Sequence, residues 1–449
     1  MSALARVMRE RGAIVSGSDL ALSPVAQALR GEGICVFEGH GVDHIQGADL
    51  VVVSSAVPRS NVEVQAATTA GLPVWSRSRF LEWLTTDHDV VAVAGTHGKT
   101  TTTAMVAEIF LHAGIDPSFV VGGVITSVQT NAHAGTGTAF VIEADEYDRT
   151  FLSLSPKIGV ILNVEHDHPD CYPTFADMRA AFEQFAGKTA QDGVLMACAD
   201  DPTAQEIGWQ FRTHGGRVAF YGLGQSAEWR AEEIRPNFAG GMDFLATHDN
   251  EVLGLVRLRV PGLHNVSNAM AAITVAALME VPFRHVRCAL KDFRGVGRRF
   301  EVKGEVDEIT VIDDYAHHPT AIRATLDAAR LRYPGRSLWA VWQPHTFSRT
   351  RTLMTEFLRA FELADHVVVL PVYAARESDT LDVSSEDIVR SMVHRDVSIA
   401  RSLEEAVIHL GTELRSGDVV ITLSAGDGYL VGEWLLVALE EGSLELVPA

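Results

Sequence analysis

"GTHGKTTTTAMVAEIF", residues 95–110, directly follows the apolar run "DVVAVA", residues 89–94. The apolar run predicts a buried strand, and the stretch after Gly98 predicts a helix. A glycine loop between a strand and a helix presents backbone N–H groups to phosphate oxygens, and a lysine at the helix start neutralises their charge. A threonine hydroxyl beside the lysine can ligate Mg²⁺. This stretch therefore predicts an α/β unit that binds a nucleoside triphosphate.

The spacing of this loop, GxxGKT, is shorter than the general phosphate-loop pattern GxxxxGK[ST], so the pattern alone is weak. The strand before it and the helix after it carry the inference. The alternative is a glycine turn followed by a surface lysine. The residues predicted to bind ATP in this loop are Gly95, Thr96, His97, Gly98, Lys99, Thr100 and Thr101.

Acidic and histidine residues follow two further apolar runs. Glu143 and Asp145 end the run in "AFVIEADEYD", and His168 follows "IGVIL" within "NVEHDHPD". Open α/β sheets bind ligands beyond the carboxyl ends of their strands. We therefore predict Thr100, Glu143 and His168 as ligands of a hard cation beside the phosphates. Taken alone, His168 would more often be a structural loop residue.

The composition narrows the class of protein. The 449 residues carry a formal net charge of −21, and no basic stripe suggests a nucleic-acid or membrane surface. No apolar run reaches the roughly 18 residues of a membrane span. The cysteines are far apart and form no CxxC pair, so we expect reduced thiols and a cytoplasmic protein. They are Cys35, Cys171, Cys198 and Cys288.

Short apolar runs alternate with helical patterns along the whole chain, which predicts parallel sheets covered by helices. We expect three α/β domains: a Rossmann-like domain at 1–87, a central ATP-binding domain at 88–294, and a Rossmann-like C-terminal domain at 295–449. Apolar runs such as "ITVIDDYAHHP" and "LWAVWQP" in the last block lead directly into polar loops.

The order of several motifs resembles the Mur ligase family over essentially the whole chain, and most closely its L-alanine-adding branch. The motifs are "GTHGKTTTT", "EADEYD", "NVEHDHPD", "PGLHNVSNAMAA", "GRRFE", "DDYAHHPT" and "QPHTFSRT". The resemblance implies ATP-dependent amide bond formation in peptidoglycan synthesis. ATP would phosphorylate the carboxylate of UDP-N-acetylmuramate, L-alanine would attack the acyl phosphate, and phosphate would leave.

The resemblance also implies roles for individual residues. The catalytic residues would be Lys99, Glu143, His168 and Arg299, with Mg²⁺, usually two ions in this family, on Thr100, Glu143 and His168. Asn268 and His264 would face the adenine, and Arg299 and Asp314 would reach the γ-phosphate and the ribose. The amino acid would be bound by Tyr315, His317, His345 and Arg349, with the arginine as a carboxylate clamp. Because ATP would bind between the second and third domains, activity should require domain closure.

Three departures from the family pattern stand out. Thr346 and His133 occupy positions where an arginine is common, so glycine or serine stays open as the amino acid. The chain begins at "MSALARVM", where the family has an earlier strand and a GxGGxGM loop. In a doubly wound sheet the first strand lies centrally, so its loss would leave two neighbouring strands unpaired. Our hypothesis is a longer natural protein, and the alternative is a tolerated truncation. The candidates for UDP-sugar contacts are Ser18, Asp19, Ser54 and Ser55.

Other activities remain open at this point. The murein tripeptide ligase shares "EADEYD" and "AHHP", although "QPHTFSRTRTL" favours L-alanine as the substrate. A catalytically impaired ATP-binding homologue and a plain nucleotide hydrolase or kinase are further alternatives. We expect a monomer or homodimer.

Overall fold

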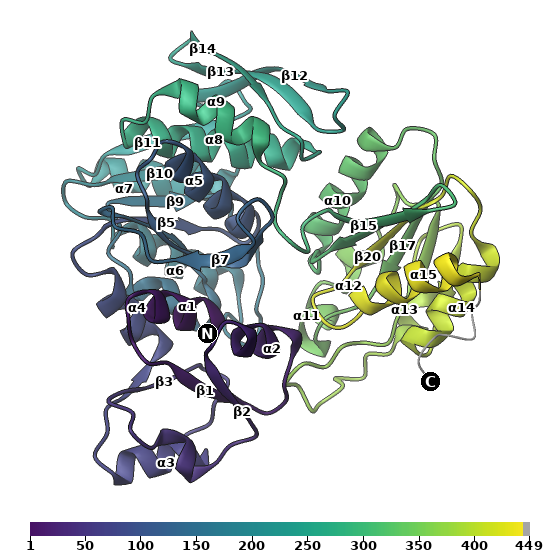
Figure 1. Cartoon of the computed structure of the whole chain (residues 1–449). Coiled ribbons are helices and arrows are strands. Elements are labelled where there is room, and N and C mark those ends of the chain that lie inside the picture. Colours follow the sequence, from purple (N-terminus) through teal and green to yellow (C-terminus); the bar gives the residue numbers. More distant parts are fainter. Residues whose placement is uncertain (443–449) are drawn as a thin grey trace.

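The computed structural model describes residues 1–442 and contains three α/β units in chain order (Figure 1). Two small parallel sheets belong to the N-terminal unit, a ten-stranded sheet to the middle unit, and a six-stranded sheet to the C-terminal unit. The three-domain α/β fold predicted from sequence is confirmed. The domain limits at 87/88 and 294/295 stay predictions.

The N-terminal unit has two separate strand pairs. β1 (Ser16–Asp19) pairs in parallel with β2 (Cys35–Glu38), and β3 (Val51–Val53) pairs in parallel with β4 (Val74–Ser76). Each of these four strands has one strand partner among residues 1–442. The helices of this unit are α1 (Ser2–Glu10), α2 (Pro24–Gly31), η1 (Val42–Ile45), α3 (Val62–Thr69) and α4 (Arg77–Thr85).

Helix α1 joins the N-terminal unit to the middle unit. Its buried face carries Leu4 and Val7, and its Arg6 pairs with Glu32 while donating to Asn131 Oδ1. His133, flagged above as a departure, is 2.9 Å from Asp116 Oδ1 and 3.2 Å from Glu10 Oε2. The structure therefore places His133 between two carboxylates at this junction.

The middle sheet has the order β14-β13-β12-β11-β10-β9-β5-β8-β6-β7. The strands β12, β11, β10, β9, β5, β8 and β6 are adjacent in this order, and all are parallel. At one edge β7 is antiparallel to β6, and at the other edge β13 is antiparallel to β12 and to β14. The strands are β5 (Asp89–Ala94), β6 (Ser118–Ile125), β7 (Thr130–His133), β8 (Ala139–Glu143), β9 (Ile158–Ile161), β10 (Val194–Cys198), β11 (Val218–Gly222), β12 (Trp229–Pro236), β13 (Met242–His248) and β14 (Glu251–Arg257).

This order positions the site. β5 lies between β8 and β9, so the loops that follow these three parallel strands meet at one edge of the sheet. β5 is an apolar run buried almost throughout, as a central parallel strand requires. The helices of this unit are α5 (Lys99–His112), η2 (Tyr147–Ser153), α6 (Phe175–Ala186), α7 (Pro202–Thr213), α8 (Leu263–Leu278) and α9 (Phe283–Asp292).

The C-terminal sheet has the order β15-β16-β20-β17-β18-β19, with only β15 antiparallel to its neighbour. Its strands are β15 (Glu301–Val306), β16 (Ile309–Asp314), β17 (Leu338–Trp342), β18 (His366–Val369), β19 (Val397–Ile399) and β20 (Val419–Leu423). Its helices are α10 (Pro319–Arg332), α11 (Phe347–Thr352), α12 (Met354–Phe357), α13 (Ser385–Ser391), α14 (Leu403–Glu413) and α15 (Tyr429–Glu441).

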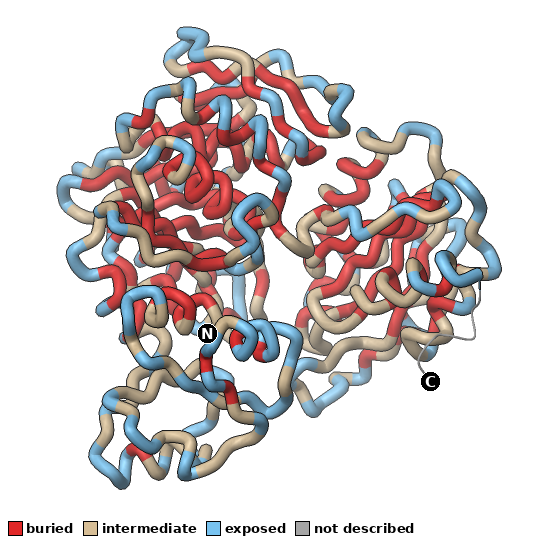
Figure 2. The backbone as a smooth tube through the Cα atoms, in the orientation of Figure 1, coloured by how far each residue is buried: buried red, intermediate tan, exposed pale blue. Residues whose placement is uncertain are grey.

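Burial follows the sheets. The strands of the middle and C-terminal sheets are mostly buried, whereas the N-terminal unit is largely exposed or half-buried (Figure 2). All four cysteines are free thiols. Within residues 1–442 no helix has the length and apolar character needed to span a membrane.

Candidate active site

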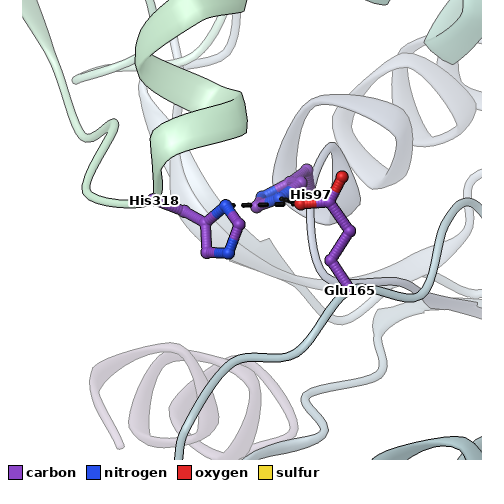
Figure 3. A group of neighbouring side chains, drawn as sticks. All are labelled: His97, Glu165 and His318. Carbon is purple, nitrogen blue, oxygen red and sulfur yellow. Dashed lines mark hydrogen bonds and ion pairs between the residues drawn. The ribbon is translucent and has the colours of Figure 1, made fainter. Parts of the chain in front are cut away.

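The phosphate loop lies between β5 and α5. Gly95 and Gly98 have φ angles of 149° and 84°, a region that glycine adopts without strain. The backbone of His97 is fixed to the segment after β9, since His97 N donates to Asn163 Oδ1 at 2.7 Å and Asn163 Nδ2 donates to His97 O at 3.1 Å. The His97 ring faces Glu165 (Figure 3). The two glycines therefore allow the backbone conformation of the loop, and Asn163 fixes its position next to β9.

Lys99 lies inside this loop. Its Nζ donates to Gly95 O at 2.6 Å and is 2.7 Å from Glu146 Oε2, and the Glu146 side chain is 1% exposed. Burial disfavours both charges, but their mutual attraction prevails, so the pKa of Lys99 is raised and the pKa of Glu146 is lowered. The alternative of a glycine turn with a surface lysine is wrong. Thr96 and Thr101 are also buried here.

Glu146 is a site residue that sequence reasoning did not single out. It is the third acidic residue of "EADEYD", three positions after Glu143, and the sequence does not say which carboxylate turns inward. Tyr172 fixes its backbone, because the phenol donates to Glu146 O at 2.6 Å. Asp145 instead pairs with Arg77 at 3.2 Å. The acidic cluster was visible in the sequence, but the pairing of Glu146 with Lys99 was not.

Two of the three predicted Mg²⁺ ligands lie in direct contact. Thr100 Oγ1 donates to Glu143 Oε1 at 3.0 Å, and Gly122 N donates to Glu143 Oε2 at 2.7 Å. Arg299 reaches Thr100 Oγ1 from the C-terminal unit at 3.3 Å. Burial raises the pKa of Glu143 despite the nearby Lys99 and Arg299. A half-buried carboxylate that is incompletely compensated, beside a hydroxyl oxygen, is a donor set that suits Mg²⁺.

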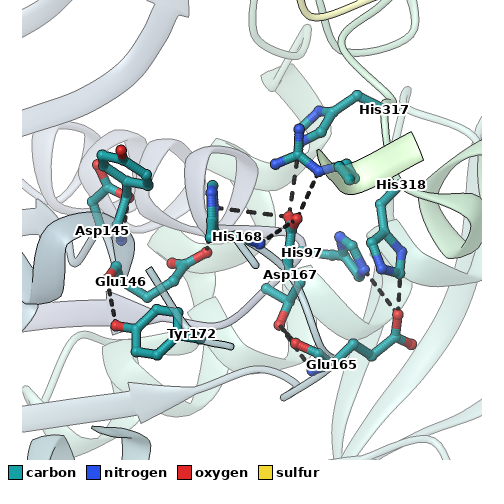
Figure 4. Close-up of polar contacts among 12 residues, drawn as sticks. His97, Asp145, Glu146, Glu165, Asp167, His168, Tyr172, His317 and His318 are labelled. Atoms are coloured by element: carbon teal, nitrogen blue, oxygen red, sulfur yellow. Dashed lines mark hydrogen bonds and ion pairs between the residues drawn. The ribbon is translucent and has the colours of Figure 1, made fainter. Parts of the chain in front are cut away.

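His168 lies at the other side of the lysine. Its Nε2 is 3.6 Å from Glu146 Oε1 and 3.8 Å from Asp167 Oδ2 (Figure 4). Burial lowers the pKa of His168, but the carboxylates of Asp167 and Glu146 raise it by more, so its pKa lies above the ordinary value. Within residues 1–442, His168 makes no hydrogen bond or ion pair to Thr100 or Glu143, so its place in a shared metal site stays a prediction.

The predicted adenine residues lie at the start of α8. Asn268 is buried, and its Oδ1 accepts from Thr102 Oγ1 at 3.2 Å while its Nδ2 donates to Asn265 Oδ1 at 3.2 Å. Asn265 in turn donates to Pro261 O at 2.7 Å. This chain of amides ties α8 to α5, next to the phosphate loop. Asn265 was not among the predicted residues.

Replacing Gly98 by alanine is expected to raise the KM for ATP about tenfold or more. A Cβ at position 98 would lie 2.5 Å from Asn268 Oδ1, and the alanine backbone would have to adopt a φ of 84°. The backbone strain costs on the order of 1–3 kcal/mol, and the amide must also move. Gly114→Ala is the matched control, since Gly114 follows the same helix with a φ of 75° and open space around it. Equal KM values in the two variants would contradict the steric argument.

The pH dependence of stability tests the environment of His264. Burial lowers its pKa to about 4, whereas the unfolded value is near 6.5. The unfolded state therefore binds more protons between these values, and stability falls as the pH is lowered through that window. We expect His264→Gln to remove about 2 kcal/mol of the loss between pH 7 and pH 5, measured by urea unfolding. Parallel curves for variant and wild type would contradict this.

Arg349 crosses from the C-terminal unit to the middle unit. Its Nε donates to Asp167 Oδ1 at 2.7 Å, and the two side chains are only 4% and 3% exposed. Its Nη1 donates to His345 O at 3.2 Å. Burial disfavours the Asp167 charge, yet Arg349 and the neighbouring histidines hold the pKa of that carboxyl well below its usual range. Nη2 has no hydrogen-bond partner in the described chain, so it remains available to a substrate.

Two neighbouring histidine rings, with centroids 5.9 Å apart, have opposite tautomers, assigned from their hydrogen-bond partners. His317 Nδ1 lies 2.8 Å from Tyr315 O, a pure acceptor, so Nδ1 carries the hydrogen and Nε2 is bare. His345 Nδ1 lies 3.0 Å from Arg349 Nη1, a pure donor, so its Nε2 carries the hydrogen. Burial lowers the pKa of both rings, that of His345 to about 4. The site thus presents one acceptor and one donor.

Asp314 and Arg299 lie at the entrance to the C-terminal unit. Asp314 accepts from Phe300 N and from Ala316 N, both at 2.7 Å, and burial raises its pKa to about 6. A ribose hydroxyl would have to share these carboxylate oxygens. The Arg299 guanidinium lies 4.9 Å from the centre of the Tyr315 ring, which holds it near the phosphate loop.

Thr346, the other departure from the family pattern, caps helix α11. Its side chain accepts a hydrogen bond from Arg349 N, and its backbone has a φ of 64°.

The candidate UDP-sugar residues are divided between the two small sheets. Ser18 Oγ donates to Glu63 Oε2 at 2.6 Å and is 3.1 Å from His40 Nδ1, so this hydroxyl already has partners. The remaining candidates make no side-chain hydrogen bond within residues 1–442. They are Asp19 at the end of β1 and Ser54 and Ser55 after β3. Their role stays a prediction.

Family comparisons cover most of the chain. The model described as "Mur ligase family, catalytic domain" matches residues 1–88, "Mur ligase middle domain" matches residues 93–276, and "Mur ligase, glutamate ligase domain" matches residues 298–426.

Full-length relatives are also found. A UDP-N-acetylmuramate–L-alanine ligase of Symbiobacterium thermophilum is 43% identical, over 98% of this chain and 92% of the relative. A ligase of the same name from Salinibacter ruber is 43% identical, over 98% and 93% of the two chains.

Two solved structures match nearly the whole chain. UDP-N-acetylmuramate-alanine ligase MurC of Thermotoga maritima has a TM-score of 0.82 at 28% identity, covering 99% of this chain and 97% of that one. A murein peptide ligase of Psychrobacter arcticus has a TM-score of 0.73 at 29% identity, covering 98% and 96%.

Proposed function

Because this chain belongs to the Mur ligase family, we propose that it joins L-alanine to the carboxylate of UDP-N-acetylmuramate in peptidoglycan synthesis. In the first step a carboxylate oxygen takes the γ-phosphoryl group of ATP, which gives an acyl phosphate and ADP. In the second step the amine of L-alanine attacks the acyl carbon, the carbon–oxygen bond to phosphate breaks, and an amide, phosphate and one proton result.

One observation carries this proposal beyond the family relationship. The phosphate loop of the middle unit meets polar loops of the C-terminal unit, through Arg299 on Thr100 and through Arg349 on Asp167. A plain nucleotide hydrolase has no need of a second unit that presents a guanidinium and two neutral imidazoles. A ligase does, since it must hold an amine beside an activated carboxylate.

The phosphoryl side of the reaction falls to Lys99, Thr100, Glu143 and Arg299. Attack by a carboxylate on a triphosphate brings like charges together, so positive groups must supply most of the barrier reduction. Lys99 would leave Glu146 in part to bind the β- and γ-phosphates, and Arg299 would approach the γ-phosphate. Mg²⁺, which Thr100 and Glu143 would hold, supplies charge neutralisation when bound. The participation of His168 as a ligand is part of the same proposal.

The amino-acid side falls to Tyr315, His317, His345 and Arg349. Nη2 of Arg349 is free to bind the alanine carboxylate. His317 Nε2 can accept a hydrogen bond from the amine, which points its lone pair in a fixed direction. The pKa of His317 lies well below its ordinary value, so the ring is a weak base, and positioning of the amine fits it better than deprotonation.

The remaining sites of the proposal are Asn268 and His264 at the adenine, Asp314 at the ribose, and Ser18, Asp19, Ser54 and Ser55 at the UDP group. A cytoplasmic location and a monomer or homodimer are proposed with them.

Phosphate release from ATP by the purified chain with Mg²⁺ and UDP-N-acetylmuramate tests the function. The arms are L-alanine, glycine, serine, the tripeptide L-Ala-γ-D-Glu-meso-diaminopimelate, and no amine. We expect release to require the UDP-sugar and to be fastest with L-alanine. Release fastest with the tripeptide would support the tripeptide ligase alternative. Release without the UDP-sugar and amine would support a hydrolase, and no release in any arm would contradict the ligase assignment for this chain.

A further inference from the structure

His97, Glu165 and His318 form a compact cluster at the junction of two units (Figure 3). His97 belongs to the phosphate loop, Glu165 follows β9, and His318 precedes α10 of the C-terminal unit. Their nearest ligand atoms all lie within 4.8 Å of one another. The proposed ligation reaction assigns no chemical role to Glu165 or His318.

The distances suit a small metal ion. His97 Nε2 is 3.2 Å from Glu165 Oε2, and His318 Nδ1 is 3.3 Å from the same oxygen. In a tetrahedral zinc site with bonds of about 2.0–2.1 Å, neighbouring donor atoms are separated by about 3.3 Å. Two of the three separations thus already match, and the third requires only a small side-chain movement.

We propose that His97, Glu165 and His318 bind a divalent transition-metal ion of the Zn²⁺ type, separate from the Mg²⁺ beside the phosphates. Two imidazoles and one carboxylate are a common donor set for such ions and leave a coordination position open. Mg²⁺ prefers oxygen ligands and suits this set poorly. The ion would connect the middle unit to the C-terminal unit and favour their closed arrangement.

The present contacts of His318 leave it free to serve as a ligand. The ring is 5% exposed, and its Nδ1 accepts only a long hydrogen bond from Thr320 N, at 3.3 Å. A metal bond at Nδ1 would replace the contact with Thr320.

Calorimetric titration of the metal-free, nucleotide-free chain with Zn²⁺ tests the proposal. We expect one ion per chain with a micromolar or lower Kd, which excess Mg²⁺ does not displace. His318→Asn keeps a side chain that can cap α10 but removes the imidazole, and Glu165→Gln removes the charge at nearly constant shape. Each should weaken binding at least tenfold. His214→Asn is the control, since His214 is an exposed residue at the C-terminal end of α7. This variant should bind Zn²⁺ with wild-type affinity.

Co²⁺ in place of Zn²⁺ gives a second readout, since its visible absorption reports four- or five-coordination. We expect that absorption in wild type and its loss in His318→Asn, with unchanged circular dichroism spectra. Absence of tight Zn²⁺ binding by wild type would overturn the proposal. So would binding by His318→Asn and Glu165→Gln with wild-type affinity. Neither measurement involves ligase turnover, so the result stands apart from the proposed function.

Discussion

Replacing Lys99 by methionine is expected to lower kcat about 10³-fold or more. Lys99 Nζ lies 2.6 Å from Gly95 O inside the phosphate loop, and its charge would meet the phosphates at the moment of transfer. Removing one such preorganised donor typically costs 10²–10³ in rate, and a full positive charge in a buried site costs more. Coupled release of phosphate with all three substrates measures the effect.

The same change has a consequence for stability. Glu146, whose side chain is 1% exposed, would lose its closer ion-pair partner and keep only His168, at 3.6 Å. Removing one member of a buried pair typically destabilises a protein by about 3–5 kcal/mol. The double variant Lys99→Met/Glu146→Gln removes that charge and should recover most of the loss in urea unfolding. Its activity should stay as low as that of Lys99→Met, which separates the catalytic effect from unfolding.

Lys157→Met is the matched control for Lys99→Met. Lys157 also pairs with a carboxylate at 2.7 Å, that of Asp89, but its side chain is 44% exposed and lies away from the phosphate loop. We expect nearly wild-type activity and a stability change below about 1 kcal/mol, as for other exposed ion pairs. If Lys99→Met retained a tenth of wild-type kcat, the proposed role of Lys99 would be wrong.

The sequence predicted those parts of the site that depend on local pattern. The strand–loop–helix at 89–112 forms as expected, because an apolar run and two glycines specify it without help from distant residues. Thr100 and Glu143 meet because β5 and β8 are parallel neighbours whose loops leave the same edge of the sheet. Alternation of strands and helices predicted parallel strands with ligand-binding residues at their carboxyl ends, but it did not predict which strands are neighbours.

Contacts between distant segments were beyond the sequence. Lys99 and Glu146 are separated by 47 positions, and Arg349 and Asp167 by 182. No pattern along a single chain states which carboxylate of an acidic cluster will meet a given cation. For the same reason, the contact of the Ser18 hydroxyl with Glu63, 45 positions away, was not predicted.

Two of these distant contacts join the middle unit to the C-terminal unit. Arg299 and Arg349 both reach from the C-terminal unit onto acidic or hydroxyl groups of the middle unit. The first contact lies at the predicted phosphate site, and the second involves a residue of the predicted amino-acid site. If the two units open and close as the resemblance implies, both contacts should break on opening, and both predicted sites should be exposed together.

Replacing Arg349 by lysine is expected to lower kcat/KM for L-alanine about 10²-fold, with the KM for ATP changed less than twofold. The guanidinium holds Asp167 through Nε and leaves Nη2 for a substrate carboxylate. An ammonium keeps the charge but not the planar fork, so it cannot serve both partners in the same geometry. Initial rates at varied L-alanine and saturating ATP measure the effect.

The lysine variant is chosen so that folding is spared. Asp167 is 3% exposed and would be left as an uncompensated buried charge by Arg349→Ala, whereas a lysine still neutralises it. Arg351→Lys is the control, since Arg351 is exposed on the same helix α11. A large loss of stability with an unchanged KM for L-alanine would mean that Arg349 only joins the two units. A raised KM for L-alanine at wild-type stability would mean that the guanidinium also binds the amino acid, because loss of the Asp167 contact alone would lower the stability.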